Sequence, residues 1–131
     1  MKNVFLFTLL LALSAGCTAP RSAANGNFDN LNNRTMTNIS SAHEAAKPVS
    51  AQSLFKGETG TVTALQILKD GLLDKHVSKV PALLVCVAGQ VAYEDENGLK
   101  QTLHNGDYVR IAPMVTHWVR GLQDSQLLLI K

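Results

Sequence analysis

The chain of 131 residues has few of the residues that mark several protein classes. Cysteine occurs twice, aromatic residues make up 5% and charged residues 17%. Two cysteines are too few for the disulfide framework that holds many small secreted proteins together. The 12 basic and 10 acidic residues give a formal net charge of +2 without a basic stripe, which argues against a nucleic-acid partner. The length predicts one domain of ordinary size, folded around its own hydrophobic core.

The N-terminus has the pattern of a secretory signal. Lys2 precedes a mostly apolar run from Val4 to Leu13, and the small residues Ser14, Ala15 and Gly16 follow. A positive start, an apolar stretch of about ten residues and a small-residue exit are typical of a signal peptide, and the stretch is too short to span a bilayer. We therefore assign residues 1–16 to a signal peptide and leave them out of the fold.

The sequence "LSAGC" resembles the end of a bacterial lipoprotein signal. That pattern has Leu three residues before the modified Cys; here Leu13 lies four residues before Cys17, and Ser14 takes the usual Leu position. The resemblance implies that Cys17 becomes the lipidated first residue and anchors the protein on the periplasmic side of a membrane in the cell envelope. The alternative is ordinary cleavage near Gly16 or a little later, which releases a soluble secreted protein.

The residues that follow are poor in apolar periodicity. Residues 18–49 are rich in Asn, Ser, Ala and Thr, and their scattered apolar residues have no helix or strand period. Such a segment cannot bury enough surface to offset the entropy of ordering it. We therefore predict a flexible tether over residues 17–50, in which His43 is solvated.

From residue 51 onward the pattern indicates an all-β domain. Short runs with β-like composition are separated by turns about every eight to twelve residues, which is typical of a sandwich or barrel. Asn97-Gly98 lies between two of these runs and is a strong hairpin signal. No segment of residues 51–131 has a long helical period, so the domain is predicted to be all-β, as a sandwich or a barrel.

One expected strand is apolar on both faces. Residues 82–88 read "ALLVCVA", so successive side chains on either side of the strand are hydrophobic. One face can line the barrel, and Cys86 is expected to be a small buried hydrophobic residue. The other face needs a second sheet layer, the N-terminal segment or another subunit, which favours a homodimer.

Two motifs resemble the signature of the cupin superfamily. Its first part runs Gly, about five residues, His-X-His, three or four residues, Glu, six residues and Gly; its second part runs Gly-Asp, an apolar strand, Pro-X-Gly and His. The matching residues of this chain are Gly71, His76, Gly89, Gly106, Asp107, Pro113 and His117. The departures are Ser78 at the second His, Ala82 at the Glu and Met114 at the second-motif Gly.

The resemblance implies a double-stranded β-helix, or jelly-roll barrel, with a pocket formed by His76, Ser78, Ala82 and His117. Cupins that bind a metal generally use two His and a Glu from the first motif and one His from the second. A divalent transition metal (Fe, Mn, Zn, Cu or Ni) would here be held by His76 and His117 alone. Sites for these metals normally have three protein ligands or more. The motif therefore predicts a pocket with weak metal affinity.

Other polar and aromatic residues have plainer expected roles. His104 lies in the turn "LHNGD" and is expected to be a solvent-exposed loop residue rather than a third ligand. Tyr93 is expected to pack within its strand, with a place at the barrel mouth as the alternative. Arg110 and Arg120 could bind a carboxylate at the opening, but the strand register that decides their direction does not follow from the sequence.

Three functions remain open at this point. The missing ligands favour a membrane-tethered periplasmic module that binds a small molecule or a protein partner without catalysis. The alternative is a metal-dependent enzyme of the dioxygenase or isomerase kind that uses His76 and His117. A third is an assembly role, in which the outer apolar face pairs with an envelope complex. The fold alone names no ligand.

Overall fold

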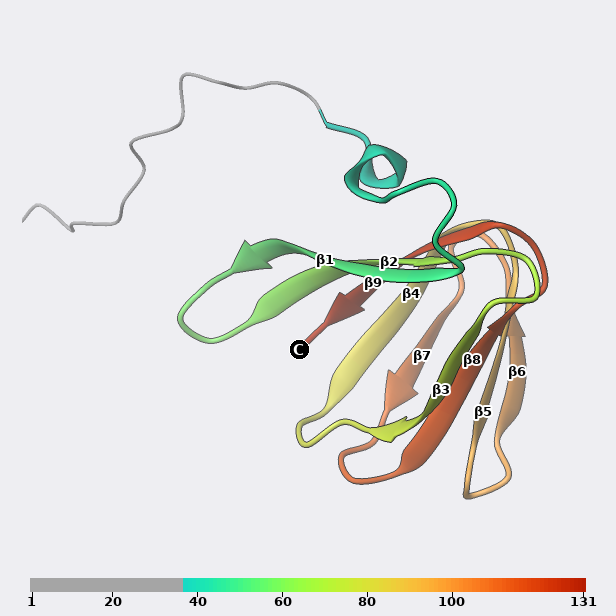
Figure 1. The fold of residues 1–131 in the computed structure, drawn as a ribbon. Coiled ribbons are helices and arrows are strands. Elements are labelled where there is room, and N and C mark those ends of the chain that lie inside the picture. Colours follow the sequence, from blue (N-terminus) through green and yellow to red (C-terminus); the bar gives the residue numbers. More distant parts are fainter. Residues whose placement is uncertain (1–36) are drawn as a thin grey trace, which may run out of the picture. The chain divides into compact units, whose positions relative to one another are not determined.

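The computed structural model describes residues 37–131, which form two facing antiparallel β-sheets (Figure 1). The first sheet has the strand order β1-β2-β9-β4-β7, and the second has the order β3-β8-β5-β6. The elements are a short 3₁₀ helix η1 (Ile39–Ala42) and strands β1 (Val49–Lys56), β2 (Thr61–Ile67), β3 (Leu72–Val77), β4 (Ala82–Ala88), β5 (Val91–Asp95), β6 (Lys100–Leu103), β7 (Tyr108–Ile111), β8 (Thr116–Gly121) and β9 (Ser125–Ile130). The all-β prediction is confirmed. No helix of residues 37–131 has the length and apolar character needed to cross a membrane.

The core lies between the two sheets and follows the period-two alternation of the strands. In β4 the side chains of Ala82, Leu84 and Cys86 are buried, whereas Leu83 and Val85 on its other face are half-buried. Burial, and then the nearby Asp107, raise the pKa of the Cys86 thiol, which makes this cysteine a packing residue rather than a nucleophile. The remaining core side chains are Leu65, Ile67, Val91, Tyr93, Leu103, Val109, Ile111, Val119 and Leu127.

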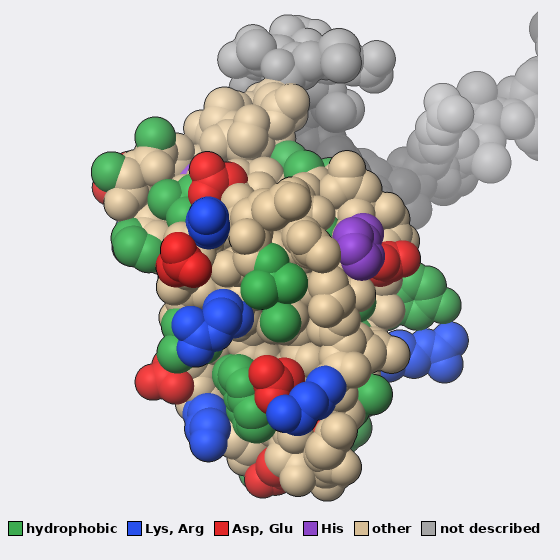
Figure 2. Space-filling view, turned by 90° about the vertical axis from the view of Figure 1, so that its right-hand side faces the viewer, with side chains coloured by type: hydrophobic (Ala, Val, Ile, Leu, Met, Phe, Trp, Pro, Cys, Tyr) green, Lys and Arg blue, Asp and Glu red, His purple; other side chains and the backbone are tan. Residues whose placement is uncertain are grey.

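The outer surface carries charges of both signs. Figure 2 shows basic and acidic side chains interspersed with small hydrophobic areas on the face that it presents. On the outer face of β4, Val87 keeps 40% of its surface exposed. The second face of this strand is thus only partly covered among the described residues.

The segment before β1 packs on the barrel, which corrects part of the predicted tether. The side-chain amide of Gln66 in β2 donates hydrogen bonds to the carbonyl oxygens of Glu44 (3.1 Å) and Lys47 (3.2 Å). The backbone N–H of Leu68 donates to the carbonyl oxygen of Pro48 at 2.9 Å. We call residues 38–48 the strap. Hydrophobic periodicity missed the strap because polar groups, and not an apolar face, hold it in place.

Two further expectations change with the strap. His43 is not solvated: its Nδ1 lies 3.0 Å from Ser50 Oγ, and its Nε2 is buried without a hydrogen-bond partner. The predicted start of the barrel at residue 51 falls inside β1, which begins at Val49. The predicted signal peptide, Cys17 and the rest of the predicted tether lie outside the described residues.

We expect the strap to loosen in mild acid. Burial lowers the pKa of His43 below its ordinary value of 6.5, so the docked strap favours the neutral imidazole. This stabilisation is present above pH 6.5 and is lost as the pH falls through the lowered pKa. Hydrogen exchange of the strap amides should therefore become faster between pH 7.5 and pH 5, after correction for intrinsic exchange. His43→Asn should remove this step, whereas the exposed-site control His104→Asn should retain it; retention in both variants would contradict the assignment.

Candidate functional site

Strands β3 and β8 place two imidazoles against each other at the pocket that both line; His117 is buried, whereas His76 is exposed. The strands pair antiparallel with His76 directly opposite His117, and the ring centroids are 4.3 Å apart at an angle of 57°. The β3 register shifts between Leu73 and His76, and both of these side chains line the same pocket. In β8, His117 and Val119 are buried, at 2% and 1% exposure, while Arg120 is exposed. Strand alternation and one local irregularity thus bring together the two His that the sequence singled out.

The hydrogen bonds of both rings fix which nitrogen faces the pocket. His76 Nδ1 lies 2.7 Å from the carbonyl oxygen of Asp74, and His117 Nδ1 lies 3.0 Å from that of Val115. A carbonyl oxygen can only accept, so each Nδ1 must carry the hydrogen and donate it. In the neutral ring, Nε2 is then an acceptor with a free lone pair. The pair therefore presents two acceptor nitrogens.

The surroundings of His117 favour its neutral form. Burial lowers the pKa of His117, and the nearby His76 and Lys131 lower it further; the hydrogen bond to Val115 and the charge of Asp95 act in the opposite direction. Tyr93 stacks on the ring, with centroids 5.8 Å apart and planes at 25°. His117 is therefore uncharged at pH 7 and is held in place by an aromatic neighbour.

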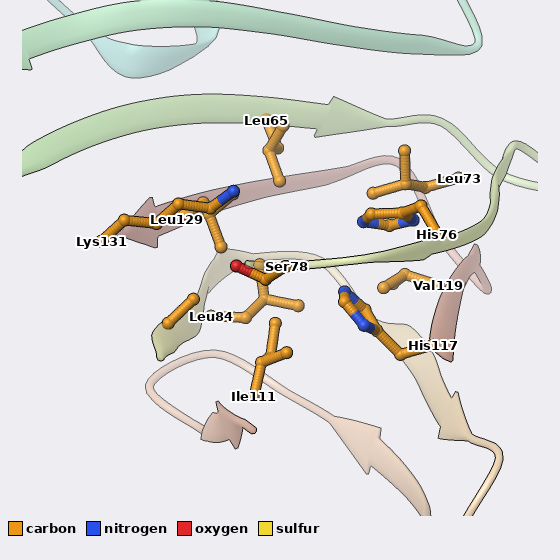
Figure 3. Close-up of a pocket in the computed structure, with 11 residues that line it drawn as sticks. Leu65, Leu73, His76, Ser78, Leu84, Ile111, His117, Val119, Leu129 and Lys131 are labelled. Atoms are coloured by element: carbon orange, nitrogen blue, oxygen red, sulfur yellow. The ribbon is translucent and has the colours of Figure 1, made fainter. Parts of the chain in front are cut away.

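A small cavity lies beside the two rings (Figure 3). The volume open to the centre of a water molecule is about 20 Å³, and all unfilled space including the open mouth is about 300 Å³. About 10–15 Å³ on the first measure is enough for one water molecule. The lining residues are Leu65, Leu73, His76, Ser78, Ala82, Leu84, Ile111, His117, Val119, Leu129 and Lys131. The cavity is thus mainly apolar, and its closed part takes a group of only a few atoms.

All four residues that the motif assigned to the pocket line this cavity. They are His76, Ser78, Ala82 and His117. Ser78 is 3% exposed, and its hydroxyl donates to the carbonyl oxygen of Val80 at 2.7 Å, which leaves its oxygen as an acceptor. Ala82 contributes only a methyl group, so the position of the motif Glu contains no ligand.

The donor set does not fit a resident transition metal. Within residues 37–131 no group of three or more His, Cys, Asp or Glu side chains converges on one point. Asp95 pairs with His117 across β5 and β8, but it does not line the cavity. Two imidazole nitrogens and a serine hydroxyl fall short of the three strong ligands that such sites normally have.

The other candidate residues lie away from the cavity. His104 is exposed in its loop, with Nδ1 3.4 Å from Asp107 Oδ2 and Nε2 3.0 Å from Gln90 Nε2. Arg110 and Arg120 are exposed, and neither lines the pocket. Lys131 was not predicted from the sequence as a pocket residue, and its side chain lines the pocket across from the imidazoles (Figure 3). Its position follows only from the pairing of β9 with β2 and β4, which no local motif reveals.

Comparison with known proteins bears on the fold. No family model matches the chain, and no curated protein matches it. A cupin superfamily protein from Desulfitobacterium hafniense superposes with a TM-score of 0.66 at 13% identity, covering 76% of this chain and 90% of the other. A conserved protein of unknown function from Streptococcus pyogenes superposes with a TM-score of 0.63 at 13% identity, covering 74% of this chain and 85% of the other. KdgF from a Halomonas species superposes with a TM-score of 0.59 at 16% identity, covering 67% of this chain and 82% of the other. At these identities the likeness establishes the fold alone.

Proposed function

We propose, on the premise that the chain has the cupin fold, that it binds a small molecule in the barrel pocket without catalysis. The observation that supports this function is the pair of facing imidazoles beside an apolar cavity that lacks a third metal ligand. Small-molecule sites combine apolar walls with a few well-placed polar groups, and this pocket has that character. The bound part of the ligand is small, because the closed space holds only a few atoms.

A fragment screen by NMR tests the proposal. The full chain with labelled methyl groups is titrated with small polar and apolar molecules, and shifts at Leu84, Ile111 and Leu129 report pocket binding. A pocket ligand should shift these signals in the native chain and lose affinity in His76→Leu. His104→Leu is the matched control, because His104 is exposed outside the pocket. The absence of any molecule that shifts the pocket signals would overturn the proposed function.

The lipid anchor is part of this proposal and rests on "LSAGC". Cys17→Ser should move the protein from the membrane fraction to the soluble periplasmic fraction, because no residue is left to carry the acyl chains. Cell fractionation followed by immunoblotting measures the shift, and Cys86→Ser is the control, because Cys86 is buried in the barrel. An unchanged membrane fraction in Cys17→Ser would contradict lipidation and leave secretion as a soluble protein or another means of attachment.

The second candidate function is a metal-dependent enzyme of the dioxygenase or isomerase kind with a reduced His76 and His117 site. The contact between the two rings, each with a free Nε2, favours it. Two imidazoles would hold a metal weakly, so we expect protein purified without a His tag to contain well under one equivalent of Fe, Mn, Zn, Cu or Ni. Elemental analysis by mass spectrometry measures this. A full equivalent that is lost in His117→Leu would favour the enzyme.

The homodimer also stays a proposal. The partly exposed outer face of β4, with Val87 at 40% exposure, supports it. A protein partner on the same face, as in the assembly role, is the competing occupant.

A further inference from the structure

The imidazole end of the pocket has acceptors but no donor. Both Nδ1 hydrogens are used by the backbone carbonyls of Asp74 and Val115, so each Nε2 is left with a lone pair. The Ser78 hydroxyl also donates its hydrogen to a backbone group, the carbonyl oxygen of Val80. A ligand atom that hydrogen-bonds to this end must bring its own hydrogen, because both Nε2 atoms can only accept.

The other end of the pocket has a cation. Lys131 lines the cavity, and Figure 3 shows its side chain extending toward the space from the side opposite the imidazoles. Burial lowers the pKa of His117, and the nearby His76 and the charge of Lys131 lower it further. The charge of Lys131 therefore acts on the imidazole end of the pocket. The ammonium group has only donors, and it favours an anionic oxygen.

The walls between the two ends are mainly apolar. Figure 3 shows Leu65, Leu84 and Ile111 around the space between Lys131 and the imidazole pair, Leu129 beside Lys131, and the Ser78 hydroxyl as the polar group among them. These aliphatic side chains favour a short hydrocarbon segment and disfavour polar groups along the middle of the ligand. The ligand must also be short, and part of it must lie in the open mouth, because the space open to the centre of a water molecule is only about 20 Å³.

We infer that the pocket takes a short aliphatic hydroxycarboxylate, with its carboxylate toward Lys131 and its hydroxyl donating to an imidazole Nε2. This inference rests on the proposed function and gives the ligand class of the same pocket. A hydroxyl suits the imidazole end better than an ammonium group, because removing an unpaired charge from water costs far more than removing a hydroxyl. An acid without the hydroxyl donates no hydrogen bond to either imidazole nitrogen, and an alcohol without the carboxylate makes no use of Lys131.

Binding of three matched probes to the full chain tests the inference at pH 7.5. We expect 3-hydroxybutyrate to bind about tenfold more tightly than either butyrate or 1-butanol, since each analogue lacks one polar contact. The pocket methyl signals in NMR titrations give the dissociation constants and show where each probe binds. Equal affinity of butyrate or 1-butanol, or no binding of 3-hydroxybutyrate at millimolar concentration, would overturn the inference.

Two lysine variants separate a specific contact from a general charge effect. Lys131→Met should abolish the preference for 3-hydroxybutyrate over 1-butanol, whereas Lys79→Met, an exposed lysine that does not line the pocket, should keep it. An unchanged preference in Lys131→Met would count against the assigned orientation. If fragments of other classes bind the pocket and the hydroxy acid does not, only the ligand class is wrong. If no molecule of any class binds there, the proposed function fails as well.

Discussion

Tyr93→Ala is expected to lower the free energy of unfolding by about 3–5 kcal/mol, as large-to-small changes at buried aromatic positions do. Tyr93 is 1% exposed in the middle of β5, where it pairs with Val119 of β8 and Gln101 of β6. The substitution would leave a cavity at the junction of three strands. Urea unfolding followed by circular dichroism measures the change.

Tyr93→Ala should also change the pKa of His117 in the pocket. Tyr93 stacks on His117, so its removal admits water beside that ring and should raise the pKa of His117 toward 6.5, its ordinary value. An NMR titration of the imidazole follows this change. Tyr108→Ala is the control, because Tyr108 is 56% exposed and its loss should change stability by no more than about 0.5 kcal/mol. Equal effects of the two substitutions would show that Tyr93 has no special packing role.

Gly121→Ala is expected to cost about 3 kcal/mol or more of folding free energy, at the upper end of what overpacking does. A Cβ at Gly121 would lie 2.0 Å from the carbonyl oxygen of Leu68 and 3.1 Å from Ile67 Cγ2. The nearer contact is with backbone, which cannot swing aside as a side chain can. Gly121 also donates to the carbonyl oxygen of Gly71 and accepts from the N–H of Asp70, which fixes the end of β8 at this approach.

Gly98→Ala is the matched control for this prediction. Gly98 has a φ of +87° but no atom within 4 Å of an added Cβ. Its substitution should therefore cost only the backbone strain of an L-residue in the left-handed region, about 1–2 kcal/mol. Urea unfolding of both variants gives the comparison. A smaller loss for Gly121→Ala than for Gly98→Ala would show that the β8 end can shift away from Leu68.

Local sequence patterns predicted the β-strands well. The strand expected over residues 82–88 is β4, and the Asn97-Gly98 signal lies in the turn between β5 and β6. The start of β1 was placed two residues late, because its residues show no apolar alternation and six of its eight positions are exposed at the sheet edge. The strap was missed for a related reason: Gln66 anchors it through hydrogen bonds, which leave no periodic trace in the sequence.

The pocket residues that belong to the two motifs could be predicted from the sequence. The resemblance to the cupin signature implied one shared pocket for His76 and His117, and the register of β3 against β8 places them side by side. Lys131 belongs to no motif, because its place in the pocket depends on the long-range pairing of β9 with β4 and β2. The direction of each imidazole nitrogen was equally beyond the sequence, because backbone carbonyls at Asp74 and Val115 decide it.

His76 and His117 both present a bare Nε2 to one pocket, and the proposed ligand site depends on this pair. Long-range ¹H–¹⁵N correlation spectra of the imidazoles at pH 8, where histidine is generally neutral, test it most directly. We expect both rings to carry their hydrogen on Nδ1 and to show the nitrogen shift of an unprotonated Nε2. A hydrogen on Nε2 of either ring would contradict it.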